Sequence, residues 1–167
     1  MRRAIFPGSF DPLTMGHLDI IERSVSLFDE IIIAVLNNPD KNPMFTPDER
    51  CEMIQEILPS VKKSECCLLV ESFAGLTVDF AKQRNCSAIV RGIRAVSDYE
   101  YELRMALMNR RLEPQIETVF LMAAEEYSYV SSNLMKQIFT LGGRVEGLVP
   151  ELVEAKMREK LGLGVRF

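Results

Sequence analysis

The fold expected for this chain is decided by Gly8-Ser9-Phe10-Asp11-Pro12-Leu13-Thr14-Met15-Gly16-His17, which follow the apolar segment Ala4-Ile5-Phe6. An amphipathic run begins at Leu18, so this region predicts a strand, a glycine-containing bend and a helix. Such a bend leaves backbone N–H groups unpaired at the start of a helix, where the helix dipole adds positive potential. The stretch therefore predicts a phosphate-binding site, and the chain's only histidine, His17, lies in the first turn of the helix.

Each of these features alone has an ordinary structural explanation, because Gly-Ser and Asp-Pro pairs occur in simple turns and one histidine can cap a helix. Together they favour a nucleotide phosphate, since glycine loops at strand-to-helix bends recur in nucleotide-binding proteins. The bend matches neither G-x-G-x-x-G nor G-x-x-x-x-G-K-[ST]. This mismatch disfavours a dinucleotide oxidoreductase and a P-loop enzyme.

Length and composition indicate one globular domain, residues 1–167, with 47% hydrophobic and 26% charged residues. The formal net charge of −4 argues against general affinity for nucleic acid, whose backbone requires an excess of Lys and Arg. It leaves room for a local basic pocket that holds a small phosphorylated ligand. No apolar run approaches the length of a transmembrane helix, and none after Met1 has the length of a signal peptide, so we expect no membrane partner.

The cysteines also bear on the compartment of the protein. Cys51, Cys66, Cys67 and Cys86 have neither C-x-x-C nor zinc-site spacing, and only one histidine is present. We therefore expect reduced structural thiols, no protein-bound metal and a cytoplasmic location.

Apolar segments alternate with helical patterns along the whole chain. Strands are expected at Arg3–Phe6, Glu30–Leu36, Cys67–Glu71, Ala88–Val90 and Thr118–Met122. Helices are expected at His17–Phe28, Pro47–Leu58, Thr77–Arg84, Asp98–Arg110, Ser132–Leu141 and Pro150–Leu161. Continuously apolar strands in this order are typical of an α/β protein with a doubly wound five-stranded parallel sheet and helices on both faces. Ligands of such sheets bind at the carboxyl ends of the strands, where the strand order reverses.

Two further loops at that edge carry phosphate-binding residue types. Arg91-Gly92-Ile93-Arg94 follows the apolar Ala88–Val90, and a guanidinium suits phosphate oxygens. The alternative is a surface salt bridge from these arginines to Asp98, Glu100 or Glu102. Tyr127–Asn133 leads into a helix and carries more hydroxyl and amide groups than one N-cap needs, so a second anion site and a plain cap both remain open.

Three motifs together resemble bacterial phosphopantetheine adenylyltransferases. They are Pro7-Gly8-Ser9-Phe10-Asp11-Pro12-x-Thr14-x-Gly16-His17, Arg91-Gly92-x-Arg94-Ala95-Val96-x-Asp98-Tyr99-Glu100-Tyr101-Glu102 and Tyr129-Val130-Ser131-Ser132. The resemblance runs from Ala4 to about the last helix and implies a Rossmann-like nucleotidyltransferase. The T-x-G-H element alone indicates only the wider nucleotidyltransferase superfamily.

The resemblance implies a reaction of coenzyme A synthesis. The phosphate of 4′-phosphopantetheine attacks the α-phosphate of ATP directly, dephospho-coenzyme A forms and pyrophosphate leaves, with Mg²⁺ accompanying ATP. Transfer of this kind needs positioning and charge stabilisation more than a protein nucleophile. The resemblance also implies a homohexamer, and coenzyme A as a feedback inhibitor in the active site.

Residue roles follow from the matched positions. His17 would donate to the α-phosphate in the transition state, and Ser9, which is often threonine in the family, would orient the attacking phosphate. Lys41 would lie near the reacting phosphates, Arg91 would hold the phosphopantetheine, and Thr77 would contact it. The ATP-binding positions are Ser9, Phe10, His17, Gly92, Ile93, Arg94, Glu102, Tyr127, Ser128, Tyr129, Val130, Ser131, Ser132 and Asn133. Some relatives carry tryptophan in place of Tyr127 and serine in place of Asn133.

Two rival functions remain, one in the same class of enzyme and one in a different class. A nucleotidyltransferase acting on nicotinamide mononucleotide or glycerol 3-phosphate is disfavoured by the run from Arg91 to Glu102. A nucleotide-sensing protein without turnover is disfavoured because binding alone does not require Ser9, His17, Lys41 and Arg91 together.

Overall fold

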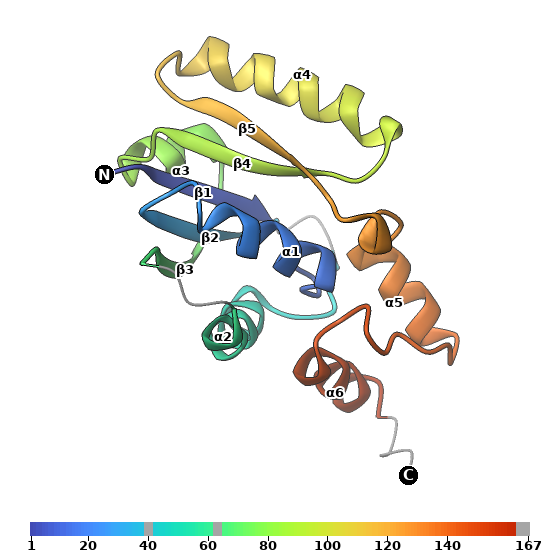
Figure 1. Ribbon diagram of the computed structural model, residues 1–167. Helices are drawn as coiled ribbons and strands as arrows, with labels where there is room; N and C mark the ends of the chain where they lie inside the picture. The colour runs from blue at the N-terminus through green and yellow to red at the C-terminus, as the bar shows by residue number, and fades with distance from the viewer. Residues whose placement is uncertain (39–41, 62–64, 163–167) are drawn as a thin grey trace.

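The computed structural model describes residues 1–38, 42–61 and 65–162. Its core is a parallel sheet of five strands in the order β3-β2-β1-β4-β5 (Figure 1). The strands are β1 (Arg3–Gly8), β2 (Glu30–Leu36), β3 (Cys67–Phe73), β4 (Ala88–Ile93) and β5 (Glu117–Met122). The chain moves outward from β1 to β3, returns to place β4 on the other side of β1, and so creates a switch point between β1 and β4.

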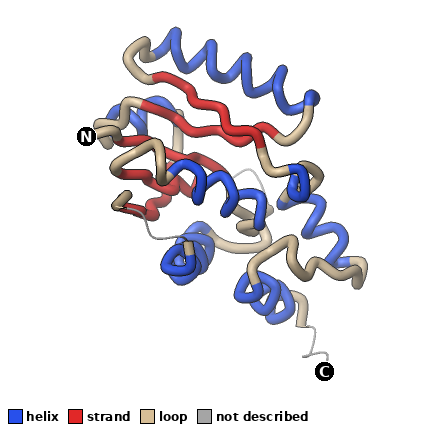
Figure 2. Tube along the Cα trace, viewed as in Figure 1, coloured by secondary structure: helices blue, strands red, loops and turns tan. Residues whose placement is uncertain are grey.

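Helices cover both faces of the sheet, as the sequence predicts (Figure 2). They are α1 (Met15–Ser24), α2 (Pro47–Ile57), α3 (Thr77–Gln83), α4 (Val96–Leu112), α5 (Ser132–Thr140) and α6 (Glu151–Lys160), with 3₁₀ turns η1 (Leu58–Ser60) and η2 (Glu125–Tyr127). α3 and α4 lie on one face, α1 and α2 lie on the other, and α6 packs beside α2 (Figure 1). No helix of the described ranges is long and apolar enough to cross a membrane.

Two apolar cores result from the alternation of side chains along each strand. Ala4 and Phe6 of β1 face the larger core, which includes apolar residues of α1, α2, α5 and α6. Ile5 faces the smaller core on the side of α3, together with Ile32 and Ile89 of the neighbouring strands. Because both faces are covered, β1 and β2 are apolar at nearly every position, whereas the edge strands β3 and β5 are only partly buried.

The observed bounds correct the sequence prediction where polar or turn residues continue a strand. β1 extends to Gly8 because Pro7 and Gly8 still pair with β2, and β4 extends to Ile93 because Arg91 to Ile93 pair with β5. Arg91 is therefore a strand residue and does not lie in the following loop.

Helix ends show smaller differences. α1 begins at Met15, two residues earlier than predicted, because Thr14 caps it, and it ends at Ser24. Pro150 precedes α6 as its N-cap and is not its first residue. At the start of α2, Thr46 and Glu49 form a capping box.

Candidate active site

A cavity of about 500 Å³ lies at the carboxyl ends of β1 and β4, at the switch point of the sheet. Its walls come from the bend after β1, the start of α1, the end of β4, α4 and the segment before α5. The lining residues are Phe6, Pro7, Gly8, Ser9, Thr14, Gly16, His17, Ile20, Arg91, Gly92, Arg94, Asp98, Tyr101, Glu102, Ala123, Val130, Ser131, Ser132 and Asn133. Three loops that the sequence places far apart therefore meet around one space.

His17 is held in a defined orientation by the cap of α1. The Thr14 side chain accepts a hydrogen bond from the His17 backbone N–H, and the Thr14 backbone N–H donates to His17 Nδ1 at 3.0 Å. Because Nδ1 accepts this bond, the ring proton lies on Nε2. The imidazole thus carries one outward N–H donor at the cavity wall.

The electrostatic surroundings keep this imidazole neutral. Burial, followed by the positive charges of Arg94 and Arg91, lowers the pKa of His17 from 6.5 to about 4. The Phe10 ring packs edge-on against the imidazole, with 5.0 Å between the ring centroids. His17 is therefore a neutral hydrogen-bond donor at physiological pH.

Ser9 and Phe10, neighbours in the bend, have opposite environments. Ser9 is exposed and lines the cavity, whereas Phe10 as a whole is only 1% exposed and does not. Phe10 has a φ of +46°, and a Cβ on Gly8 would lie 3.0 Å from its ring. The structure thus places Phe10 against His17 and not at the cavity wall, and its ring supports His17.

Both predicted arginines line the cavity, and both also form the salt bridges that the sequence left open as the alternative. Arg91 binds Glu102 in bidentate fashion, at 2.7 Å from Nε and 2.5 Å from Nη2, and donates to the Pro7 carbonyl at 2.8 Å. Arg94 Nε lies 3.0 Å from Asp98, and its Nη1 donates to the Val130 carbonyl at 2.9 Å. Glu102, predicted to contact ATP, is thus a partner of Arg91.

The segment Tyr127–Asn133 is divided in the structure. Val130, Ser131, Ser132 and Asn133 line the cavity, whereas Tyr127 to Tyr129 do not. The Ser131 hydroxyl accepts from the Leu134 N–H as the cap of α5, and the Ser132 hydroxyl donates to the Pro12 carbonyl at 2.7 Å. The ordinary cap is therefore present, and it brings the segment against the bend after β1.

The remaining predicted residues lie elsewhere. Thr77 begins α3 and lines a smaller cavity of about 160 Å³, which shares Arg91 and Glu102 with the first. Ile93 is 5% exposed and does not line the larger cavity, although Gly92 does. Lys41 falls outside the described residues.

Two lining residues outside the predicted site hold predicted ones in place. Thr14 orients His17, and Asp98, expected only as a possible salt-bridge partner, binds Arg94. The T-x-G-H spacing and the helical spacing from Arg94 to Asp98 were the available signals for these two contacts. Within the described ranges, no three His, Cys, Asp or Glu side chains form a group that could hold a metal ion.

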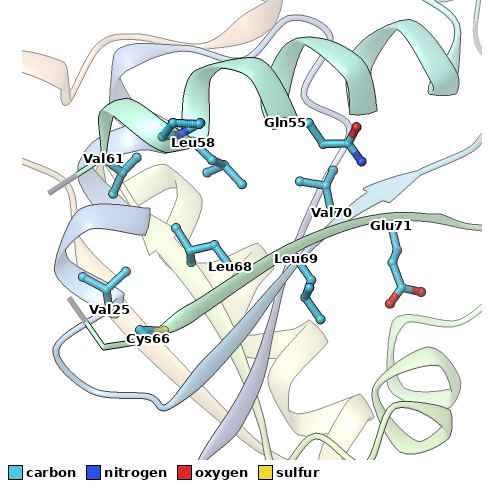
Figure 3. Close-up of a pocket in the computed structure, with 10 residues that line it drawn as sticks. Val25, Gln55, Leu58, Val61, Cys66, Leu68, Leu69, Val70 and Glu71 are labelled. Carbon is cyan, nitrogen blue, oxygen red and sulfur yellow. The ribbon is translucent and has the colours of Figure 1, made fainter. Parts of the chain in front are cut away.

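A second large cavity, of about 580 Å³, lies between α2 and β3 (Figure 3). Leu68 and Val70 point toward α2 there, whereas Leu69 and Glu71 point to the opposite face of the strand. None of the predicted site residues lines this cavity. Most of the predicted site residues in the described part of the chain therefore line the cavity at the switch point.

Comparison with known proteins gives consistent matches over nearly the whole chain. The profile of the cytidylyltransferase-like family matches residues 5–138. A phosphopantetheine adenylyltransferase from Desulfosudis oleivorans is 52% identical over 162 residues, which are 97% of this chain and 94% of that protein. Proteins of the same description from Carboxydothermus hydrogenoformans and Clostridium kluyveri are 51% and 53% identical, over 96% and 92% of this chain and 96% and 91% of theirs.

Proposed function

Because the chain belongs to the phosphopantetheine adenylyltransferases of the cytidylyltransferase-like family, we propose that its switch-point cavity transfers an adenylyl group from ATP to 4′-phosphopantetheine. The products are dephospho-coenzyme A and pyrophosphate, in the synthesis of coenzyme A. The observation that carries this proposal is a neutral imidazole N–H donor beside two arginines in one cavity.

His17 stabilises the transition state in this proposal. Attack on the α-phosphate places negative charge on its oxygens, and the Nε2–H that Thr14 fixes is a preorganised donor for that charge. A neutral donor suits the role because it lowers the energy of the developing charge without transferring its proton. No protein nucleophile is required, so the phosphate of phosphopantetheine attacks directly and pyrophosphate leaves from the opposite side.

Ser9 and Lys41 bind the reacting phosphates, and the exposed Ser9 hydroxyl at the cavity wall supports its part of this assignment. ATP contacts Arg94 and Gly92, with the segment Val130–Asn133 over it, and Phe10 acts through its ring against His17. The hydrogen bond from Arg94 to the Val130 carbonyl joins these two segments, which supports a nucleotide site between them.

Arg91, Glu102 and Thr77 form the phosphopantetheine side of the site. Arg91 lines both cavities, and the smaller one continues from it toward Thr77 between β4 and α4. Apolar Met105 and polar Asn109 line this smaller cavity, and they suit a ligand arm with alternating methylene and amide groups.

Mg²⁺ is assigned to ATP rather than to a protein-bound site. Among the described residues, Asp98 and Glu102 are the carboxylates that line the cavity, and each is already paired with an arginine. Such a site suits an ion that is held mainly by the phosphates of the substrate. Mg²⁺ bound there supplies neutralisation of phosphate charge.

The assembly and the compartment are also part of this proposal. Residues 1–167 form a single nucleotidyltransferase domain, and the protein is a cytoplasmic homohexamer. Exposed Leu107, Met108 and Leu112 on α4 support an oligomer interface, and the four cysteines are free thiols. Coenzyme A contains the same pantetheine arm as the substrate, and it acts as an inhibitor by occupying the same cavities.

One assay tests the activity. The purified protein is incubated with ATP, Mg²⁺ and 4′-phosphopantetheine, and pyrophosphate release is measured against a reaction with nicotinamide mononucleotide. We expect release with 4′-phosphopantetheine only. Release with nicotinamide mononucleotide only would assign the chain to another nucleotidyltransferase activity, and release with neither would support a binding protein without turnover.

A further inference from the structure

Arg50 of α2 is buried, with 3% of its surface exposed, and it points at the main chain of the active-site bend. Its Nη1 donates to the Ser9 carbonyl at 2.5 Å and to the Leu36 carbonyl at 3.1 Å. Its Nε donates to the carbonyls of Phe45 and Thr46, at 3.1 and 3.3 Å. One guanidinium thus joins the bend after β1, the end of β2 and the start of α2.

Asp11 makes the complementary set of contacts from the bend itself. Asp11 is 4% exposed, and its carboxylate accepts from the N–H groups of Met44 and Phe45, at 3.0 and 2.9 Å. Lys136 of α5 donates to the same carboxylate at 2.8 Å. Phe45 is therefore bound through its N–H by Asp11 and through its carbonyl by Arg50, which leaves this contact region little freedom to shift.

Stability alone is a weak reason to bury this guanidinium. Within the described ranges its hydrogen-bond acceptors are four neutral carbonyls, and no carboxylate forms an ion pair with it. Burial lowers the pKa of Arg50, whereas the negative charge of Asp11 opposes that shift. A buried charged group is often no more stabilising than an apolar side chain of similar volume, so geometry is the better explanation for its presence.

We propose that Arg50 is a positioning residue for adenylyl transfer, which holds the Ser9 carbonyl and thereby fixes the Ser9 hydroxyl at the cavity. Arg50 touches no substrate in this proposal and acts only through the backbone of the bend. The proposal rests on the proposed function, because Ser9 orients the attacking phosphate there. A displacement of about 1 Å in such a group can cost as much as about 10²-fold in rate.

The test is a double-mutant cycle on turnover, with Arg50→Gln, Ser9→Ala and the double variant. Pyrophosphate release with ATP, Mg²⁺ and 4′-phosphopantetheine gives kcat per folded molecule and the KM for ATP. We expect Arg50→Gln to lower kcat by about tenfold or more and to change the KM for ATP by less than about threefold. In the Ser9→Ala background the same change should lower kcat by less than about twofold, because the positioned hydroxyl is already absent.

Arg3→Gln is the matched control, because it changes a partly buried arginine at the opposite end of β1, where Arg3 is paired with Glu30. It should leave kcat within about twofold of wild type even where it lowers the melting temperature. Arg50→Lys should restore part of the kcat, since an ammonium reaches one or two of the carbonyls but does not bridge all four. Should Arg50→Gln fail to fold, the cycle is run with Arg50→Lys.

Independent, multiplicative losses of kcat in the cycle would overturn the positioning role. So would wild-type kcat in a folded Arg50 variant, or a loss that Arg3→Gln reproduces. An inactive wild-type protein would instead refute the proposed function, so the two failures are distinguishable.

Discussion

The two ends of the parallel sheet use the same charged residue types for different purposes. At the amino ends, Arg3 pairs with Glu30 of the neighbouring strand, and Arg2 lies 2.9 Å from Asp29. At the carboxyl ends, Arg91 pairs with Glu102 at 2.5 Å. An arginine–carboxylate pair is therefore present at both ends, and the pair alone does not identify the active site.

The ends differ in what the charges face. Arg91 and Arg94 line the cavity that contains His17, and their positive charges help to lower the pKa of that imidazole. The Arg3 side chain donates to the Arg84 carbonyl and joins β1 to the end of α3. The end of the sheet at which an arginine lies therefore decides what it can bind. In sheets of this kind, ligands bind at the carboxyl ends of the strands, where the N-termini of helices are also exposed.

Among changes at the two ends of the sheet, removal of the His17 imidazole should have the largest effect on turnover. We expect His17→Ala to lower kcat by about 10²–10³-fold, because it removes a preorganised donor to developing charge. The affinity for ATP, measured by calorimetry, should change little. Turnover within a few-fold of wild type would show that the carboxyl-end imidazole is not part of the chemistry.

The next largest effect should come from replacing an arginine at the carboxyl ends, and the same replacement at the amino ends is its control. Arg91→Met should lower kcat/KM for 4′-phosphopantetheine by about 10-fold to 100-fold, since hydrogen bonds to charged groups contribute about 1.5–3 kcal/mol. Arg3→Met should leave kcat/KM within about twofold of wild type. Equal losses in the two variants would mean that each arginine acts through general stability of the sheet.

A smaller effect concerns stability as a function of pH. His17 binds a proton near pH 6.5 in the unfolded chain but only near pH 4 in the folded chain. The contribution of His17 to the free energy of unfolding is therefore complete above pH 6.5 and is lost as the pH falls toward 4. Between pH 7 and pH 5 it amounts to about 2 kcal/mol of unfolding free energy. Urea denaturation of wild type and His17→Gln at both pH values isolates the contribution of His17. The same change in unfolding free energy between the two pH values in both proteins would contradict the lowered pKa.

Local sequence signals predicted the bend, its helix and the alternation of strands and helices along the chain, because each depends on neighbouring residues. The ends of β1 and β4 were predicted two or three residues too early, at Phe6 and Val90. The reason is that pairing with an adjacent strand continues a strand through residues that locally indicate a turn.

Contacts between distant segments could not be predicted in the same way. Arg50 meets the Ser9 carbonyl across 41 residues, and Lys136 meets Asp11 across 125. The buried position of the Phe10 ring depends on the backbone turn after Gly8, which gives Phe10 a positive φ. Such placements follow from tertiary packing, and no pattern within the motif itself specifies them.

The most direct test of the account uses the fact that the chain has one histidine. Nitrogen-15 NMR of the imidazole, titrated with and without ATP and Mg²⁺, reports its pKa, its tautomer and its contact with nucleotide. We predict a neutral ring with the proton on Nε2, a pKa of about 4, and a shift of the Nε2 resonance when ATP binds. A ring that titrates near its ordinary value of 6.5 and does not respond to ATP would contradict the placement of the reaction at the carboxyl ends of β1 and β4.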